Sequence, residues 1–207
     1  ANHEGHLNMT ELHSYPECVG LVLAAGYGQR FGSDKRLAKL ADGNNLLVAT
    51  LLRAQEAFSD VRIVLKAEDD AQALAIPPYI QVVRAAQAKQ GMGSSLAAGI
   101  KSLAHSQADA VAVLLGDMPW VSLATLLQLR AHAHAEHIVV AYCDGQRGHP
   151  VLFGRRFWPE LMQLQGENGA KGLIATHAQH VIEVTFNDSG ILQDVDKPAD
   201  LSHPATS

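Results

Sequence analysis

The chain has 207 residues, of which 47% are hydrophobic and 18% are charged, a composition that can bury one sizeable core. Its formal net charge is −5 and its Lys and Arg residues form no cluster, which argues against nucleic acid as a partner. No apolar run reaches the length of a membrane span, so we expect no membrane association.

The polar ends of the chain and the spacing of its cysteines indicate the bounds of the domain and the cellular compartment. Polar ends predict flexible tails over residues 1–16 and 202–207, around one domain covering residues 17–201. The only cysteines, Cys18 and Cys143, lie far apart and show no CxxC or Cys/His pattern, so neither a disulfide framework nor a structural zinc site is indicated. We therefore expect a cytoplasmic protein.

Short apolar runs alternate with segments of helical spacing. In chain order, the expected strands are residues 18–25, 61–66, 80–84, 110–115, 138–142 and 181–186. The expected helices are residues 46–58, 94–104, 122–136 and 155–165. Runs that are apolar at successive positions are typical of strands buried on both faces of a parallel sheet. This order predicts a three-layer α/β/α sandwich of the Rossmann-like kind, with a mostly parallel sheet and a β-hairpin excursion over residues 141–154.

The first expected strand runs directly into a glycine-rich loop, from Gly26 to Lys35. Its glycines let the backbone turn closely, so that successive N–H groups can approach phosphate oxygens. A Rossmann dinucleotide site would have its third glycine one position earlier, and no Walker A string is present. The cations Arg30 and Lys35 favour a polyphosphate ligand, with a solvated surface turn as the alternative.

Five strings together resemble a known family. LAAGYGQRFGSDK is similar to the signature LAAGxSxRFGxDK of molybdenum-cofactor nucleotidyltransferases, and four more strings follow in the family's order: GMGSSL, GDMP, GHPVLF and DVDKPADL. The resemblance covers roughly residues 18–201. LAAG in place of LAGG resembles molybdenum cofactor cytidylyltransferases, the MocA type of the MobA-like family, more than the guanylyltransferases. Tyr27, Arg36 and the string GENGAK at residues 166–171 depart from the family's usual residues.

The resemblance implies an Mg²⁺-dependent enzyme that joins CMP from CTP to the terminal phosphate of molybdopterin and releases pyrophosphate. The implied catalytic residues are Arg30, Lys35 and Asp117, and the implied metal ligands are Asp117 and Asp196. The implied binding residues for nucleotide and acceptor are Leu23, Ala24, Ala25, Gly26, Gly28, Gly93, Ser94, Ser95 and His149. No role is assigned to Glu167, because the acid in that string is shifted from its usual place.

Several of these residues could have a purely structural role instead of a role in binding or catalysis. Asp117 follows a strand at the edge where the glycine loop emerges, which suits a hard cation shared with phosphates, but it could also cap the next helix. Asp194 and Asp196 lie two positions apart on an extended segment, which sends both carboxylates to one side, so either could complete the metal site. Asp196 could instead cap a helix that starts at Pro198. The loop from Gly91 to Ser95 either caps its helix or leaves N–H groups free for a ligand.

Other functions remain open at this stage. Another MobA-like transferase, with a different nucleotide or acceptor, would use the same motifs. A non-catalytic chaperone could carry the pterin cofactor to a molybdenum hydroxylase, although intact Arg30, Lys35 and Asp117 argue against it. A nicotinamide-dependent oxidoreductase would need an acid about 20 residues beyond the glycines and after a second strand, a place that neither Asp42 nor Glu56 fills.

Overall fold

The computed structural model describes residues 16–26 and 32–202. The tails expected at both ends fall outside these ranges except for residues 16 and 202, and so do Gly28 and Arg30. The fold and the site are therefore described below from the two ranges alone.

Eight strands form one mixed sheet, and their bounds are β1 (Cys18–Leu23), β2 (Val61–Lys66), β3 (Gln81–Ala85), β4 (Ala110–Leu115), β5 (Ile138–Cys143), β6 (Gln146–Arg147), β7 (Val151–Gly154) and β8 (Val181–Thr185). The strand order is β3-β2-β1-β4-β7-β5, with β6 and β8 both paired to β5. Strands β1 to β4 run parallel, and β7 runs antiparallel to both of its neighbours. The expected mostly parallel sheet is confirmed.

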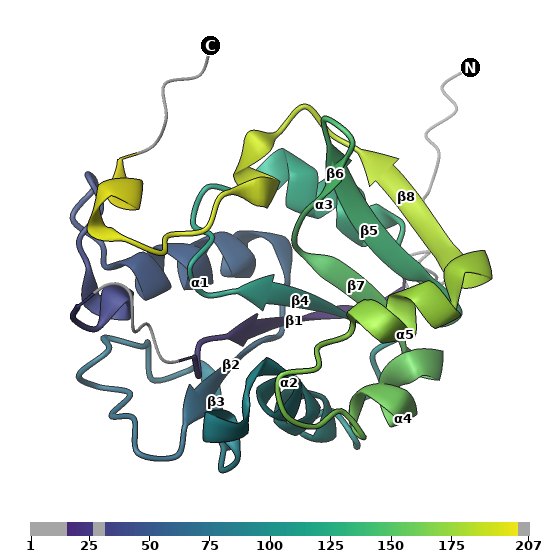
Figure 1. The fold of residues 1–207 in the computed structure, drawn as a ribbon, viewed down its shortest axis with the longest axis horizontal. Coiled ribbons are helices and arrows are strands. Elements are labelled where there is room, and N and C mark those ends of the chain that lie inside the picture. Colours follow the sequence, from purple (N-terminus) through teal and green to yellow (C-terminus); the bar gives the residue numbers. More distant parts are fainter. Residues whose placement is uncertain (1–15, 27–31, 203–207) are drawn as a thin grey trace, which may run out of the picture.

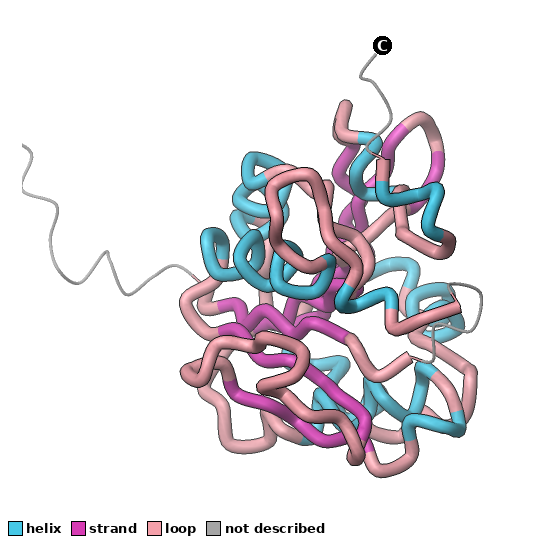
Figure 2. Tube along the Cα trace, turned by 90° about the vertical axis from the view of Figure 1, so that its left-hand side faces the viewer, coloured by secondary structure: helices cyan, strands magenta, loops and turns pink. Residues whose placement is uncertain are grey.

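Helices cover both faces of this sheet. They are α1 (Leu46–Ala57), α2 (Met92–Lys101), α3 (Leu123–Ala131), α4 (Trp158–Leu161) and α5 (Lys171–Thr176). Figure 1 shows α1 with α3 on one face, and α2 with α4 on the other, in agreement with their contacts. Figure 2, turned by 90°, shows the magenta strands as a twisted layer between cyan helices. The three-layer sandwich is therefore confirmed.

The core lies in two clusters, one on each side of the sheet, and the central strands supply both. In β1, Val22 packs with α1 and α3 through Leu51 and Leu126, whereas Leu21 packs with α2 through Leu96 on the other side. Successive side chains of a strand point to opposite faces, so a strand between two helical layers must be apolar throughout. That requirement explains the uninterrupted apolar runs of β1 and β4.

Some elements differ from the expectation. The helix expected over residues 122–136 ends at Ala131, where His132 and Ala133 donate to carbonyls three residues back and tighten the last turn. The segment 155–165 contains only a short 3₁₀ turn and the four residues of α4. The β5–β6 hairpin is present, with Asp144 and Gly145 both at positive φ, as its two-residue turn requires. The following strand, β7, leaves the hairpin and inserts between β4 and β5.

Candidate active site

A cavity of about 520 Å³ opens at the carboxyl ends of the central strands. Strands β1 and β4 are in register, with Leu23 opposite Leu115, so the segments that follow them emerge side by side. In parallel sheets ligands bind beyond this edge. Of the described binding and catalytic residues expected from the sequence, those that line the cavity are Leu23, Ala24, Ala25, Gly26, Lys35, Ser95 and Asp117.

Asp117 is held in place by the backbone on either side of Gly116. The Gly116 N–H donates to the Leu23 carbonyl over 2.9 Å, and the Gly116 carbonyl accepts from the buried Thr50 hydroxyl over 3.1 Å. The Asp117 carbonyl accepts from the Val195 N–H over 2.9 Å. These three bonds tie the end of β4 to β1, to α1 and to the C-terminal segment, so Asp117 sits on a rigid support.

Lys35 and Asp117 form an ion pair at the cavity. Lys35 Nζ lies 2.9 Å from Asp117 Oδ2 and 3.0 Å from the Val195 carbonyl oxygen. Their side chains are 19% and 21% exposed, so both remain accessible to a ligand. The structure thus brings together a cation and a carboxylate that are 82 residues apart in the chain.

Arg36, which departs from the family's usual apolar residue, is buried between two carboxylates. Its guanidinium contacts Asp69 at 2.7 and 2.8 Å and Asp34 at 2.9 Å, and it also donates to the Ala24 carbonyl over 2.9 Å. Hydrogen bonds from Arg36 lower the pKa of Asp34. Burial tends to raise the pKa of Asp69, but the Arg36 contacts and the Lys66 N–H outweigh it and the pKa is lowered. The network fixes the backbone on both sides of Lys35.

The second acid at the cavity is Asp194. It lines the cavity, whereas Asp196 is not among the lining residues. Between them, Val195 is fully buried and docks against Asp117. The N–H groups of Asp196 and Lys197 both donate to the Asp200 carboxylate, at 3.1 and 2.9 Å, so the cap of the last 3₁₀ turn is Lys197 and not Asp196.

The start of α2 is packed against the loop over residues 166–168. A Cβ atom on Gly93 would lie 2.1 Å from the Asn168 carbonyl oxygen, so a backbone segment fills the space that its missing side chain leaves. Ser94 donates its N–H to the Gly166 carbonyl over 3.3 Å and accepts from the Gly166 N–H through Oγ over 3.0 Å. Gly93 and Ser94 therefore hold this loop, and of the three expected residues only Ser95 lines the cavity.

Glu167 is a cavity residue that the sequence reasoning left without a role. The loop over residues 166–168 carries it to the cavity edge beside Gly91. The departure of GENGAK from the family's usual string was the available signal, but a shifted acid in a loop does not reveal which distant helix the loop packs against. Lys89 and Met92 also line the cavity.

His149 lies near the acids without lining the cavity. Its N–H donates to the Ile191 carbonyl over 2.9 Å, which anchors the residue to the C-terminal segment. Burial lowers the pKa of His149, and the nearby Arg147 adds to this, while Asp117 and Asp194 oppose it. The net lowering favours a neutral imidazole close to both carboxylates at neutral pH.

The acids present fit a divalent cation shared with phosphates. Within residues 16–26 and 32–202, no group of three or more His, Cys, Asp or Glu side chains is arranged to hold a metal ion by itself. A hard cation such as Mg²⁺ commonly takes one or two carboxylates and completes its shell with substrate phosphates and water. Asp117 and Asp194 offer that donor set beside the Lys35 ammonium.

Within residues 16–26 and 32–202, no helix has the length and apolar character needed to cross a membrane.

The chain is similar to known proteins over most of its length. The purine catabolism protein PucB of Bacillus subtilis (strain 168) is 30% identical over 197 residues, covering 88% of this chain and 93% of the relative. The crystal structure of Rv0371c from Mycobacterium tuberculosis H37Rv is 30% identical with a TM-score of 0.79, over 90% of this chain and 96% of that one. A complex of Rv0371c with manganese is 28% identical with a TM-score of 0.73, over 89% and 95% of the two chains. Residues 20–181 match the MobA-like NTP transferase domain, so the chain belongs to that nucleotidyltransferase family.

Proposed function

We propose that the protein transfers CMP from CTP to the terminal phosphate of molybdopterin, with release of pyrophosphate. The Lys35–Asp117 pair carries the proposal, because it sets an ammonium group beside a carboxylate at the edge of the sheet where the parallel strands β1 and β4 end. Family membership supports a nucleoside triphosphate as the donor. The cytidylyl and molybdopterin assignments rest on the LAAG string at residues 23–26 and on the order of the other motifs.

The reaction needs alignment and charge neutralisation more than proton transfer. An oxygen of the acceptor phosphate attacks the α-phosphorus of CTP, and the bond from that phosphorus to the bridging oxygen of the β-phosphate breaks. An ionised phosphate is already a nucleophile, so no general base is required. Lys35 and Arg30 would stabilise the negative charge that develops on the leaving pyrophosphate. The backbone at Gly26 and Gly28 would hold the phosphates.

The acids would act through a divalent cation. Asp117, with Asp194 as its cavity-lining partner, would hold Mg²⁺, and the ion would neutralise charge on the triphosphate. Asp196 remains the alternative partner that the family resemblance favours. The manganese complex of Rv0371c supports a divalent cation in a relative of this chain. His149, close to Asp117 and Asp194, is assigned to the acceptor side.

A nucleotide panel tests the proposal. Pyrophosphate release is measured with molybdopterin, Mg²⁺ and each of CTP, GTP, ATP and UTP. We expect kcat/KM for CTP to exceed that for GTP by at least about tenfold, which corresponds to about 1.4 kcal/mol. Equal use of both nucleotides, or a preference for GTP, assigns the protein to a MobA-like transferase with another nucleotide. Tight molybdopterin binding without pyrophosphate release from any nucleotide points instead to a chaperone for a molybdenum hydroxylase.

A further inference from the structure

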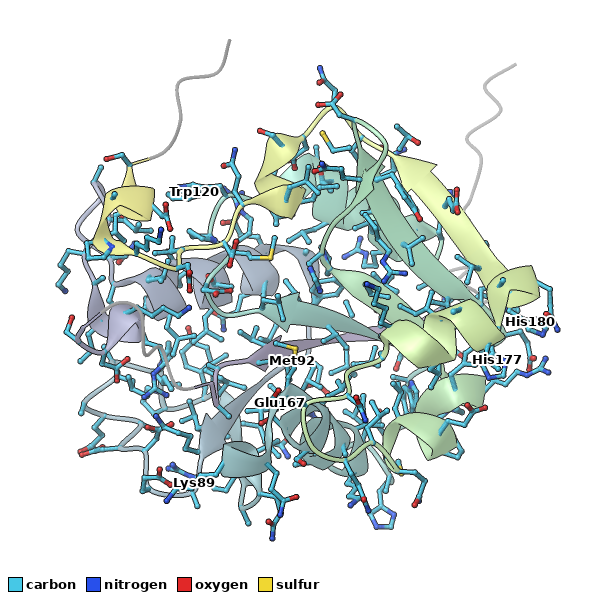
Figure 3. The ribbon with its side chains drawn as sticks, viewed as in Figure 1. Lys89, Met92, Trp120, Glu167, His177 and His180 are labelled. Carbon is cyan, nitrogen blue, oxygen red and sulfur yellow. The ribbon has the colours of Figure 1, made fainter. Side chains whose placement is uncertain are left out.

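The cavity crosses the edge of the sheet and has two chemically different ends. Lys35 belongs to the 3₁₀ turn over Lys35–Leu37, which packs against α1 on one face of the sheet. Met92, Ser95 and Glu167 belong to α2 and its attached loop, and α2 packs on the opposite face against β2 and β3. Figure 3 shows Met92 and Glu167 side by side at this second end.

Charge decides which part of a nucleotide suits each end. A triphosphate is attracted by the Lys35 ammonium and by a cation held at Asp117, whereas at the α2 end the Glu167 carboxylate opposes the charge of Lys89. The stronger attraction at the Lys35 end favours the phosphates there, which leaves the α2 end for the base and ribose.

The backbone of Glu167 is pressed against the start of α2. Gly91 has φ +122°, and a Cβ atom there would lie 2.7 Å from Glu167 Cα and 2.8 Å from its nitrogen. Only glycine fits such a position, since the conformation and the space both exclude a side chain. Together with the paired Ser94–Gly166 hydrogen bonds, this contact fixes the place from which the carboxylate projects.

The side chains at this end match a flat base with a donor on its edge. Met92 is 52% exposed and offers a polarisable thioether, which packs favourably on aromatic rings. Ser95 is only 5% exposed and lines the cavity. Within the described part of the chain, neither the Ser95 hydroxyl nor the Glu167 carboxylate has a hydrogen-bond or ion-pair partner. An ionised carboxylate only accepts hydrogen bonds, so it selects for N–H groups.

We infer that Glu167 accepts a hydrogen bond from the exocyclic amino group of the nucleobase, with Met92 against the ring and Ser95 at its edge. The inference rests on the proposed function in that the ligand is a nucleoside triphosphate. Cytosine carries an amino group where uracil carries a carbonyl oxygen. Glu167 therefore discriminates against UTP, because a carbonyl facing a carboxylate leaves both acceptors unpaired.

Equilibrium binding of CTP and UTP tests this, with Mg²⁺ present and no acceptor, so that no turnover is needed. We expect the unmodified protein to bind CTP at least about tenfold more tightly than UTP. Glu167→Gln should bring the two affinities within about threefold, because an amide can donate to a carbonyl or accept from an amino group. Glu167→Lys should reverse the preference. Glu183→Gln, an exposed acid on β8, is the matched control and should leave the ratio unchanged.

A second variant covers the case in which Glu167→Gln or Glu167→Lys misfolds. Glu167→Asp keeps the charge but withdraws the carboxylate by one methylene group, so it should lower the ratio of CTP affinity to UTP affinity, with thermal stability monitored in parallel. A wild-type ratio near one, or an unchanged ratio in folded Glu167→Gln, overturns the inference while leaving nucleotide transfer intact. If the unmodified protein binds no nucleoside triphosphate, the proposed function fails first and the inference falls with it.

Discussion

Cavities of similar volume, about 520 and about 540 Å³, open at the two ends of β1. The second cavity is lined by residues such as Glu17, Cys18, Asp60 and Arg130 at the amino end of the strand. There, Asp60 pairs with the neighbouring Arg62 at 3.2 Å, and Arg130 donates to the Ala57 carbonyl. Burial raises the pKa of the Cys18 thiol to about 12, so it stays protonated at neutral pH.

Volume therefore does not separate the two cavities, but the charged side chains that line them do. At the carboxyl end, Lys35, Asp117, Asp194 and Glu167 come from separate segments and face one space. The loops that follow parallel strands converge there, because all of those strands end at the same edge. At the amino end, fewer charged residues line the cavity, and of these Asp60 and Arg130 are bonded to Arg62 and to the Ala57 carbonyl. The comparison predicts that substitutions at the carboxyl end affect the reaction and those at the amino end do not.

The largest effect is expected for Asp117→Asn. The amide keeps the shape of the side chain but removes the charge that a hard cation needs, so Mg²⁺-dependent pyrophosphate release should fall on the order of 10³-fold. Thermal stability should change little, because the partner Lys35 is partly exposed. If the variant unfolds while its folded fraction remains active, Asp117 is a structural cap and the site lies elsewhere.

Lys35→Ala and Arg30→Ala should each lower kcat by about 10²-fold or more, because each would remove a cation from the leaving pyrophosphate. Arg30 lies outside the described residues, so its variant tests the family resemblance alone. Lys101→Ala, at the end of α2, provides a cation control away from the cavity. Activity of either cavity variant within threefold of the unmodified protein would contradict the assignment of that residue.

Arg36→Leu should destabilise the protein by about 3 kcal/mol, because it leaves Asp34 and Asp69 without their buried partner. For a chain of this size the melting temperature should fall by roughly 6 to 12 °C. Arg36→Lys should recover only part of the loss, since an ammonium lacks the planar fork that bonds both carboxylates. Adding Asp69→Asn to Arg36→Leu should restore stability by removing an unpaired charge. Wild-type melting of Arg36→Leu would show that the network contributes nothing.

The same network predicts a pH dependence of stability. The pKa values of Asp34 and Asp69 are lowered in the folded protein from the ordinary 3.8, so both carboxylates favour the folded state when ionised. Their contribution is complete above about pH 4 to 5 and is lost as the pH falls through the folded pKa values. Thermal melts from pH 6 down to pH 2 should show a smaller acid-induced loss in Asp69→Asn than in the unmodified protein. Parallel curves for both proteins would contradict the assignment.

The smallest effect is expected at the amino-end cavity. Arg130→Ala should leave kcat/KM within about twofold, and it should cost about 1 kcal/mol of stability through the lost hydrogen bond to Ala57. A large loss of activity without unfolding would show that the second cavity participates in the reaction. It would contradict the prediction that only the cavity at the carboxyl end of β1 does so.

The contact between Lys35 and Asp117 follows from reasoning that the sequence supports. One residue follows the loop after the first strand and the other follows a later strand of the same apolar kind, so parallel pairing brings them to one edge. The continuous apolar runs of β1 and β4 likewise predicted a sheet that is covered on both faces. The hairpin turn at Asp144 and Gly145 was recognisable because its residue types permit positive φ.

Only the tertiary structure decided which neighbours these segments have. Local periodicity reports which face of an element is buried, but not that β7 inserts between β4 and β5. Alternation treated Asp194 and Asp196 alike, and docking of Val195 against Asp117 separated them. Gly93 supports a loop more than 70 residues away, and that packing brings Glu167 to the cavity. Such contacts depend on complementary shapes between distant segments, which no local pattern along the chain records.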